Sequence, residues 1–88
     1  MMSDKSPLTF PTEFPIKVMG KDTQDFHASV AEIFARHVAP LENLKVSRQA
    51  SREGRFVSVT VTFTAESRAQ LDALYTELSG NQHVLMSL

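Results

Sequence analysis

The stretch from residue 55 to residue 64, RFVSVTVTFT, constrains the fold more than any other part of this 88-residue chain. Its side chains alternate between two sides, with Val57, Val59, Val61 and Phe63 on one and Ser58, Thr60 and Thr62 on the other. A period of two predicts a β-strand with one buried face and one wetter face. The stretch is rich in β-branched residues and has no Gly or Pro, so we expect a central strand rather than an edge strand.

The first part of the chain predicts a strand followed by a helix. Phe14, Ile16 and Val18 alternate with more polar neighbours, with Pro15 at the beginning of the strand and Gly20 at its end. Either Asp22 or Thr23 is suited to cap the following helix. The helix carries one apolar stripe and ends before Ala39-Pro40; the stripe is Phe26, Val30, Ile33, Phe34 and Val38.

The second part predicts a hairpin, a helix and a last strand. Residues 44–50 form a weaker strand, and Glu53-Gly54 suits a tight turn into the central strand. Thr64 or a neighbour caps the second helix, with Glu66 in its first turn and Gly80 after its end. Leu71, Leu74, Tyr75 and Leu78 follow helical spacing. In the last strand, residues 83–87, we expect inward-facing Val84, Met86 and Leu88 and an outward-facing Leu85.

The predicted order is β-α-β-β-α-β, which indicates an α+β, ferredoxin-like two-layer sandwich. We expect an antiparallel sheet in the order 4-1-3-2, with both helices on one face. Residues 1–9 would form a flexible tail and residues 10–88 a single domain. The uncovered outer face would carry a candidate interaction surface of Lys17, Met19, Phe56, Ser58, Thr60 and Leu85, able to bind a protein partner or a second copy.

Composition narrows the classes of function. The formal net charge is −1, which disfavours a dedicated nucleic-acid-binding protein. The chain has no Cys and no long apolar run, so it cannot form disulfides, and we expect a cytoplasmic protein without a membrane span. His27, His37 and His83 lack metal-ligand spacing, and no hydrolase motif is visible. We therefore expect neither an enzyme nor a metal or other cofactor.

Two further groups of residues offer alternative functions. Gly20, Asp22 and Thr23 lie where a strand leads into a helix, and free N–H groups there can receive the carboxylate of an amino-acid-like ligand. An ordinary turn with a helix cap explains the same residues more simply. A basic cluster around the hairpin suggests nucleic-acid binding, but only Phe56 is available to stack on a base; the cluster is Lys45, Arg48, Arg52 and Arg55.

Several pieces of the chain resemble the YbeD-like family of small uncharacterised bacterial proteins. They are Phe10-Pro11-x-x-Phe14-Pro15-x-Lys17-Val18-Met19-Gly20, Arg36-His37, Val57-Ser58-Val59-Thr60, Leu74-Tyr75-x-x-Leu78 and Val84-Leu85-Met86-x-Leu88. The resemblance implies a ferredoxin-like fold similar to ACT regulatory domains, and implies no catalytic residue. It suggests amino-acid-dependent regulation by analogy of fold, which does not determine function.

Three hypotheses follow. The first is a non-catalytic regulatory or protein-interaction module that acts through the open sheet face or an edge strand. The second is an ACT-like sensor of an amino acid or small metabolite at Gly20, Asp22 and Thr23. The third, less favoured, is nucleic-acid binding through the basic hairpin.

Overall fold

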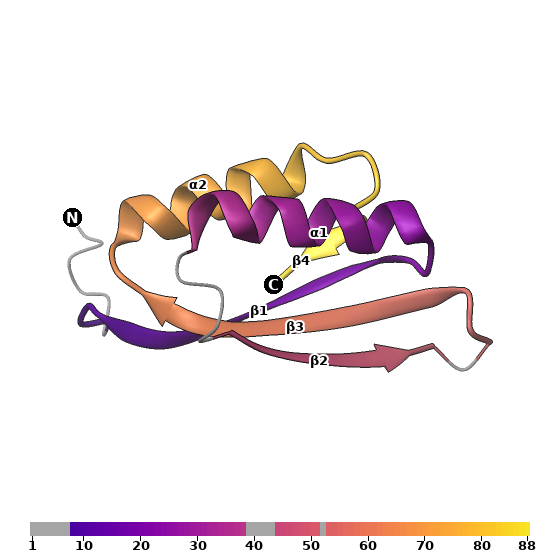
Figure 1. Ribbon diagram of the computed structural model, residues 1–88, viewed down its shortest axis with the longest axis horizontal. Helices are drawn as coiled ribbons and strands as arrows, with labels where there is room; N and C mark the ends of the chain where they lie inside the picture. Colours follow the sequence, from indigo (N-terminus) through magenta and orange to yellow (C-terminus); the bar gives the residue numbers. More distant parts are fainter. Residues whose placement is uncertain (1–7, 39–43, 52) are drawn as a thin grey trace.

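The computed structural model describes residues 8–38, 44–51 and 53–88, in which a four-stranded sheet carries two helices (Figure 1). The elements follow the predicted order: β1 Thr12–Lys21, α1 Gln24–His37, β2 Lys45–Ala50, β3 Phe56–Ala65, α2 Arg68–Ser79 and β4 Met86–Ser87. The strands lie in the order β2-β3-β1-β4, and every neighbouring pair is antiparallel. Both helices cover the same face of the sheet (Figure 1). The predicted ferredoxin-like sandwich is thus confirmed.

The core lies between the helices and the inner face of β1 and β3. Val57, Val59, Val61 and Phe63 are all buried, as the alternation in β3 predicts. They pack with the apolar stripes of the helices, which contribute Phe26, Val30, Ile33 and Phe34 from α1 and Leu71, Leu74 and Leu78 from α2. Burial of one such large apolar side chain is worth roughly 1.5–3 kcal/mol. The core thus holds the helices on the inner face of the sheet and leaves the outer face without helices (Figure 1).

Strand β1 is longer than predicted and contains Pro15 as its fourth residue, opposite Thr62. The N–H of Lys17 donates to Leu88 on the β4 side. Backbone groups of alternate residues point the same way, so the nitrogen of Pro15 also faces that side. On that side β4 pairs with Val18 and Met19, and Leu88 bonds to Lys17, so among the described residues no strand lies beside Pro15 to need its missing N–H.

Both helices begin at a hydroxyl cap. Thr23 Oγ1 accepts the N–H of Phe26 at 3.1 Å, one of the two alternatives predicted for α1. The cap of α2 is Ser67, whose Oγ accepts the N–H of Gln70 at 3.1 Å. The predictions for Thr64 and Glu66 are wrong, because β3 continues through Ala65 and Glu66 precedes the cap.

The ends of the helices and the hairpin follow the sequence pattern. Gly80 caps α2, and its N–H donates to the carbonyl oxygen of Thr76 at 3.1 Å. Gly54 has φ +76° in the turn between β2 and β3, a conformation that Gly adopts without strain. The predicted stop at Ala39-Pro40 lies outside the described residues.

The register of β4 differs from the prediction. Met86 lies opposite Met19 and Ser87 opposite Val18, so Met86 is on the outer face and Ser87 on the inner face. Leu88 pairs with Lys17 by two backbone hydrogen bonds and is exposed. The inward orientation predicted for Met86 and Leu88 is therefore wrong, whereas Val84 does pack against the core. The strand is preceded by a turn, in which Asn81 accepts hydrogen bonds from the N–H groups of His83 and Val84. Because of this turn, β4 is only two residues long.

The packed part of the chain begins no later than Leu8. This residue, which the sequence places in the tail, is partly buried against the core together with Phe10. Residues 1–7 lie outside the described part. Within the described ranges, neither helix has the length and apolar character required to span a membrane.

Candidate interaction surface

The outer face of the sheet, opposite the helices, brings most of the predicted surface residues together. In the pairing of β1 with β3, Lys17 lies opposite Thr60 and Met19 opposite Ser58. Phe56 begins β3 on the same face, opposite Lys21. The sheet has its helices on the other face only, so these side chains are not covered by them (Figure 1).

One end of this face holds an apolar hollow of about 340 Å³. Met19, Phe56, Leu85 and Met86 line it, together with Gly20, Gln49, Ser51, Val57 and Ser58. Among the large apolar side chains, Phe56 is 40% exposed, Met86 52% and Leu85 64%. We call Met19, Phe56, Leu85 and Met86 the apolar patch. Met86 was missed from the sequence because the predicted register of β4 turned it into the core.

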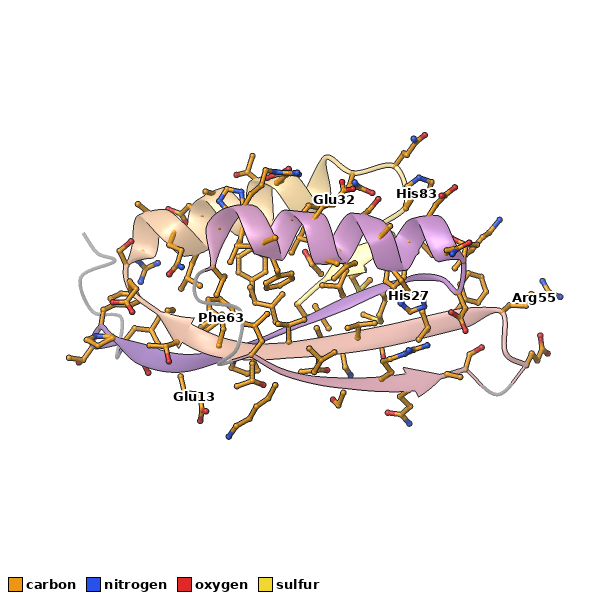
Figure 2. The ribbon with its side chains drawn as sticks, viewed as in Figure 1. Glu13, His27, Glu32, Arg55, Phe63 and His83 are labelled. Atoms are coloured by element: carbon orange, nitrogen blue, oxygen red, sulfur yellow. The ribbon has the colours of Figure 1, made fainter. Side chains whose placement is uncertain are left out.

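Unpaired positive charge flanks the apolar patch. Lys17 lies next to Met19 along β1, and Lys21 lies opposite Phe56. Among the described residues, no carboxylate forms an ion pair with either lysine. The ion pair of Lys45 with Glu13, 3.6 Å between Nζ and Oε2, lies toward the other end of the sheet (Figure 2). The patch therefore has a basic rim.

The loop from β1 to α1 uses most of its polar groups within the chain. The N–H of Asp22 donates to the carbonyl oxygen of Arg55 at 2.9 Å, and the N–H of Thr23 donates to the carbonyl oxygen of Lys21 at 2.8 Å. The carboxylate of Asp22 lies 2.7 Å from Nε2 of His27. Gly20, Asp22 and Thr23 thus lie together, but a ligand would have to compete with these partners.

Gly20 is closely packed rather than open to a ligand. A Cβ at this position would lie 2.5 Å from the carbonyl oxygen of His83 and 2.5 Å from the ring of Phe26. Beside the loop is a hollow of about 320 Å³ lined by Lys21, Thr23, Gln82, His83 and Leu85. A small polar molecule would enter this hollow rather than reach Gly20.

The basic cluster does not form one surface. Lys45 lies opposite Thr62 on the outer face, whereas Arg48 lies opposite Val59 on the helix side of the sheet. Arg55 is 3.9 Å from the carboxylate of Glu53, and Arg52 lies outside the described residues. The structure therefore divides the charges between two faces.

A cluster between the helices was not predicted from the sequence. The carboxylate of Glu77 on α2 bonds to the guanidinium of Arg36 and lies 2.6 Å from Nε2 of His37, both on α1. The hydrogen bonds from Arg36 and then from His37 hold the pKa of Glu77 below its usual 4.5. Gln70 also donates to the carbonyl oxygen of His37 at 2.8 Å. The cluster joins the two helices, which is a structural role.

Histidine and acidic side chains do not gather into a metal site in the part of the chain that the structure describes. No three of them lie close enough there to hold an ion. His27 and His37 each have a carboxylate partner, and His83 lies in the turn before β4.

Comparison with known proteins agrees with the resemblance seen in the sequence. Residues 5–88 match the family model described as a protein of unknown function, DUF493. A UPF0250 protein of Nitrosomonas europaea is 38% identical over 87 residues, which is 99% of this chain and 100% of that protein. A UPF0250 protein of Chromobacterium violaceum is 39% identical over 89 residues, and the match covers both chains completely.

Solved structures share the fold at low identity. The solution structure of HP0495 from Helicobacter pylori has a TM-score of 0.75 at 18% identity, covering 99% of this chain and 91% of that chain. The ACT domain from the GTP pyrophosphokinase of Chlorobium tepidum has a TM-score of 0.66 at 15% identity, covering 88% and 97%. At these low identities the solved structures show only a shared fold. The family model and the relatives at 38–39% identity match the sequence itself over almost the whole chain. The chain therefore belongs to the uncharacterised bacterial DUF493 family of UPF0250, YbeD-like proteins.

Proposed function

We propose that this protein is a non-catalytic regulatory module that binds a partner protein through the apolar patch on its outer sheet face. The observation that carries the proposal is the hollow of about 340 Å³ among side chains that the helices leave uncovered. Exposed apolar surface beside a cavity is typical of protein-binding sites.

The surroundings of the patch indicate the chemistry of the partner. Lys17 and Lys21 have no ion-pair partner among the described residues, so acidic side chains on the partner would complement them. An apolar side chain would fill the hollow between Phe56 and Met86. The expected partner surface is thus an apolar anchor with an acidic rim.

A non-catalytic role fits the polar groups of the site. The hydroxyl groups of Ser58 and Thr60 lie on the outer face, and among the described residues neither forms a hydrogen bond with a histidine. A histidine is the most common base that activates a nucleophilic hydroxyl. The absence of Cys fits a reducing compartment, and we propose that the protein works in the cytoplasm.

The test uses charge substitutions within the patch. Phe56→Glu and Leu85→Glu place a carboxylate in the hollow, whereas Ala73→Glu places the same charge on the exposed side of α2. Partners captured from a bacterial extract would be identified, purified and titrated by calorimetry against each variant. We expect Phe56→Glu and Leu85→Glu to lose at least ten-fold in affinity, and Ala73→Glu to bind as the wild type does.

Two controls make the result decisive. Circular dichroism and thermal melts must show that all variants are folded, and sedimentation must show whether the wild type self-associates. If self-association alone is lost in Phe56→Glu, the partner is a second copy of the chain. If both patch variants bind every purified partner as tightly as Ala73→Glu does, the outer face is not the binding surface.

A second candidate function is sensing of an amino-acid-like ligand beside the loop of Gly20, Asp22 and Thr23. The hollow of about 320 Å³ next to Thr23 supports it, because Lys21 and His83 in its lining can bind a carboxylate. A ligand present at 100 times its Kd would stabilise the fold by about 2.7 kcal/mol. A panel of amino acids that produces no thermal shift at millimolar concentration would remove this candidate.

A further inference from the structure

A second recess lies on the helix side of the sheet, between α1 and the edge strand β2. Its volume is about 270 Å³, and its walls are mainly apolar: Val30, Ala31 and Phe34 from α1, Leu44 and Val46 beside or in β2, and Val59 and Val61 from β3, with His27 and Arg48. Val46 is 57% exposed although it lies opposite buried Val61. The recess exists because the helices cover β3 but leave the inner face of β2 open. We call it the α1–β2 groove.

The backbone of β2 is open along the side of this groove. Ser51 donates its N–H to Phe56 on β3. By alternation along the antiparallel ladder, Lys45, Ser47 and Gln49 also direct their backbone groups to β3. The N–H and C=O groups of Val46, Arg48 and Ala50 therefore point out of the sheet. These are the three residues of β2 whose side chains lie on the groove side.

Strand β2 has few of the features that protect an edge. All six residues are exposed, none is Pro, and the pairing with β3 runs from Lys45 to Ala50 without a bulge. Proteins usually block such an edge by a bulge, a Pro, a charge or a covering segment. Here the charges of Lys45 and Arg48 are the main protection. Lys45 already pairs with Glu13 on the outer face, so Arg48 is the residue that would select a partner of opposite charge.

Charge favours an acidic partner strand over a second copy. Among the described residues, no carboxylate pairs with Arg48, which lines the groove. In the registers that pair most of the two strands, antiparallel pairing of β2 with β2 of a second copy would bring the two Arg48 side chains opposite or diagonal to each other on one face. Like charges in those positions are destabilising, whereas a carboxylate opposite Arg48 is favourable.

We propose that β2 accepts an extended acidic segment of a partner protein, which pairs with Val46, Arg48 and Ala50 as a fifth strand. Side chains two residues apart on that segment would share the groove side. An apolar one would lie against Val46 and Phe34, and an Asp or Glu would lie opposite Arg48. This mode of recognition combines main-chain hydrogen bonds with a side-chain pocket. It uses none of the outer-face patch, so it stands independently of the function proposed above.

The test is a selection of short random peptides displayed on phage against the whole protein. We expect enriched peptides to carry Asp or Glu two positions from a large apolar residue. Synthetic copies should slow the amide hydrogen exchange of Val46, Arg48 and Ala50. Arg48→Glu should weaken their binding at least ten-fold, and Lys21→Glu, the same charge reversal on the outer face, should leave it within two-fold.

Each other outcome overturns the proposal. An absence of enriched peptides, enrichment without acidic residues, or equal affinity for Arg48→Glu and Lys21→Glu would each do so. A dimer of the wild type whose exchange protection falls on β2 would assign the edge to a second copy instead. Phe56→Glu should bind the peptides as tightly as the wild type does. If this variant loses peptide binding, the peptides bind to the outer face and not to β2. Arg48 is exposed, and thermal melts would verify that its variant is folded.

Discussion

The close packing around Gly20 leads to a measurable cost for a single added methyl group. Gly20 lies in β1 opposite Val57, on the buried side of the sheet. A Cβ there would lie 2.5 Å from the backbone carbonyl oxygen of His83 and 2.5 Å from Cδ1 of Phe26, closer than real Cβ contacts come. The ring of Phe26 is fully buried in the core, so it has little freedom to move away. Gly20→Ala must therefore shift either this ring or the turn before β4.

The size of the effect follows from two opposing contributions. Extra volume in a packed core costs typically about 1–3 kcal/mol. The lower entropy of the unfolded chain returns about 0.4–1 kcal/mol when Gly becomes Ala. We expect a net loss of about 1–2 kcal/mol in the free energy of unfolding. A change of 1 kcal/mol moves the Tm of a domain of this size by about 4–8 °C.

The other two glycines of the chain serve as controls, and urea unfolding followed by circular dichroism measures all three variants. In Gly80→Ala the added Cβ would lie 3.5 Å from its nearest atom, the carbonyl oxygen of Thr76, which is an ordinary contact distance. The φ angle of Gly80 is −89°, which alanine also adopts. Gly80→Ala should be neutral or stabilising by up to about 1 kcal/mol. At Gly54 an added Cβ would lie in open space, but φ is +76°, which is unfavourable for alanine. Gly54→Ala should therefore lower the free energy of unfolding by about 1–2 kcal/mol. If Gly20→Ala lies within about 0.5 kcal/mol of the wild type, as surface substitutions do, the packing argument is refuted.

Three further substitutions test the core, a helix cap and the cluster between the helices. Leu74→Ala removes a side chain with 0% exposure and should lower the free energy of unfolding by about 2–5 kcal/mol in urea; a smaller loss would contradict the observed core. Ser67→Ala should cost about 0.5–2 kcal/mol and Thr64→Ala clearly less, and the reverse order would restore the cap predicted from the sequence. Glu77 has a lowered pKa in the fold, so its ionised form stabilises the protein above its unfolded pKa, and this contribution is lost as the pH falls through the folded pKa. Glu77→Gln should therefore destabilise at neutral pH but not at strongly acidic pH in thermal melts, and an equal effect at both would exclude the pairing.

The parts of the fold that could be predicted are those whose signal is local and periodic. The alternation from Val57 to Phe63 is long enough to identify a strand and its buried face, and the structure confirms both. The stripe from Phe26 to Val38 likewise identifies the buried side of α1. Once two helices and four strands were recognised, the order of the sheet followed from the packing rules for this topology.

The cap of α2 was less predictable because a hydroxyl can serve either a strand or a helix. Thr64 and Ser67 both precede the apolar stripe at plausible distances. Thr64 pairs with Glu13 in the long β1–β3 ladder, which keeps it in the strand. Ser67 follows the last paired residue, Ala65, and is free to turn its Oγ toward Gln70. The length of the partner strand, a tertiary property, decided between them.

Strand β4 shows most clearly how a long-range contact overrides a local pattern. Its apolar residues Val84, Met86 and Leu88 share a parity, which predicts that they share a face. The turn at Asn81 holds Val84 against the core, but regular pairing begins only at Met86, where the backbone follows Met19. Shared parity holds only within a continuous strand, and this one is two residues long. Its short pairing with β1 therefore sets the register.

The same register decides how much of the candidate site is apolar. A shift by one residue moves every side chain of a strand to the other face. With Met86 turned inward, the outer face would have offered Phe56, Met19 and Leu85 around a mostly polar sheet. With Met86 turned outward, these side chains together close a hollow of about 340 Å³. The register thus leaves Met86 52% exposed instead of buried, and its side chain completes the hollow on which the proposed function rests.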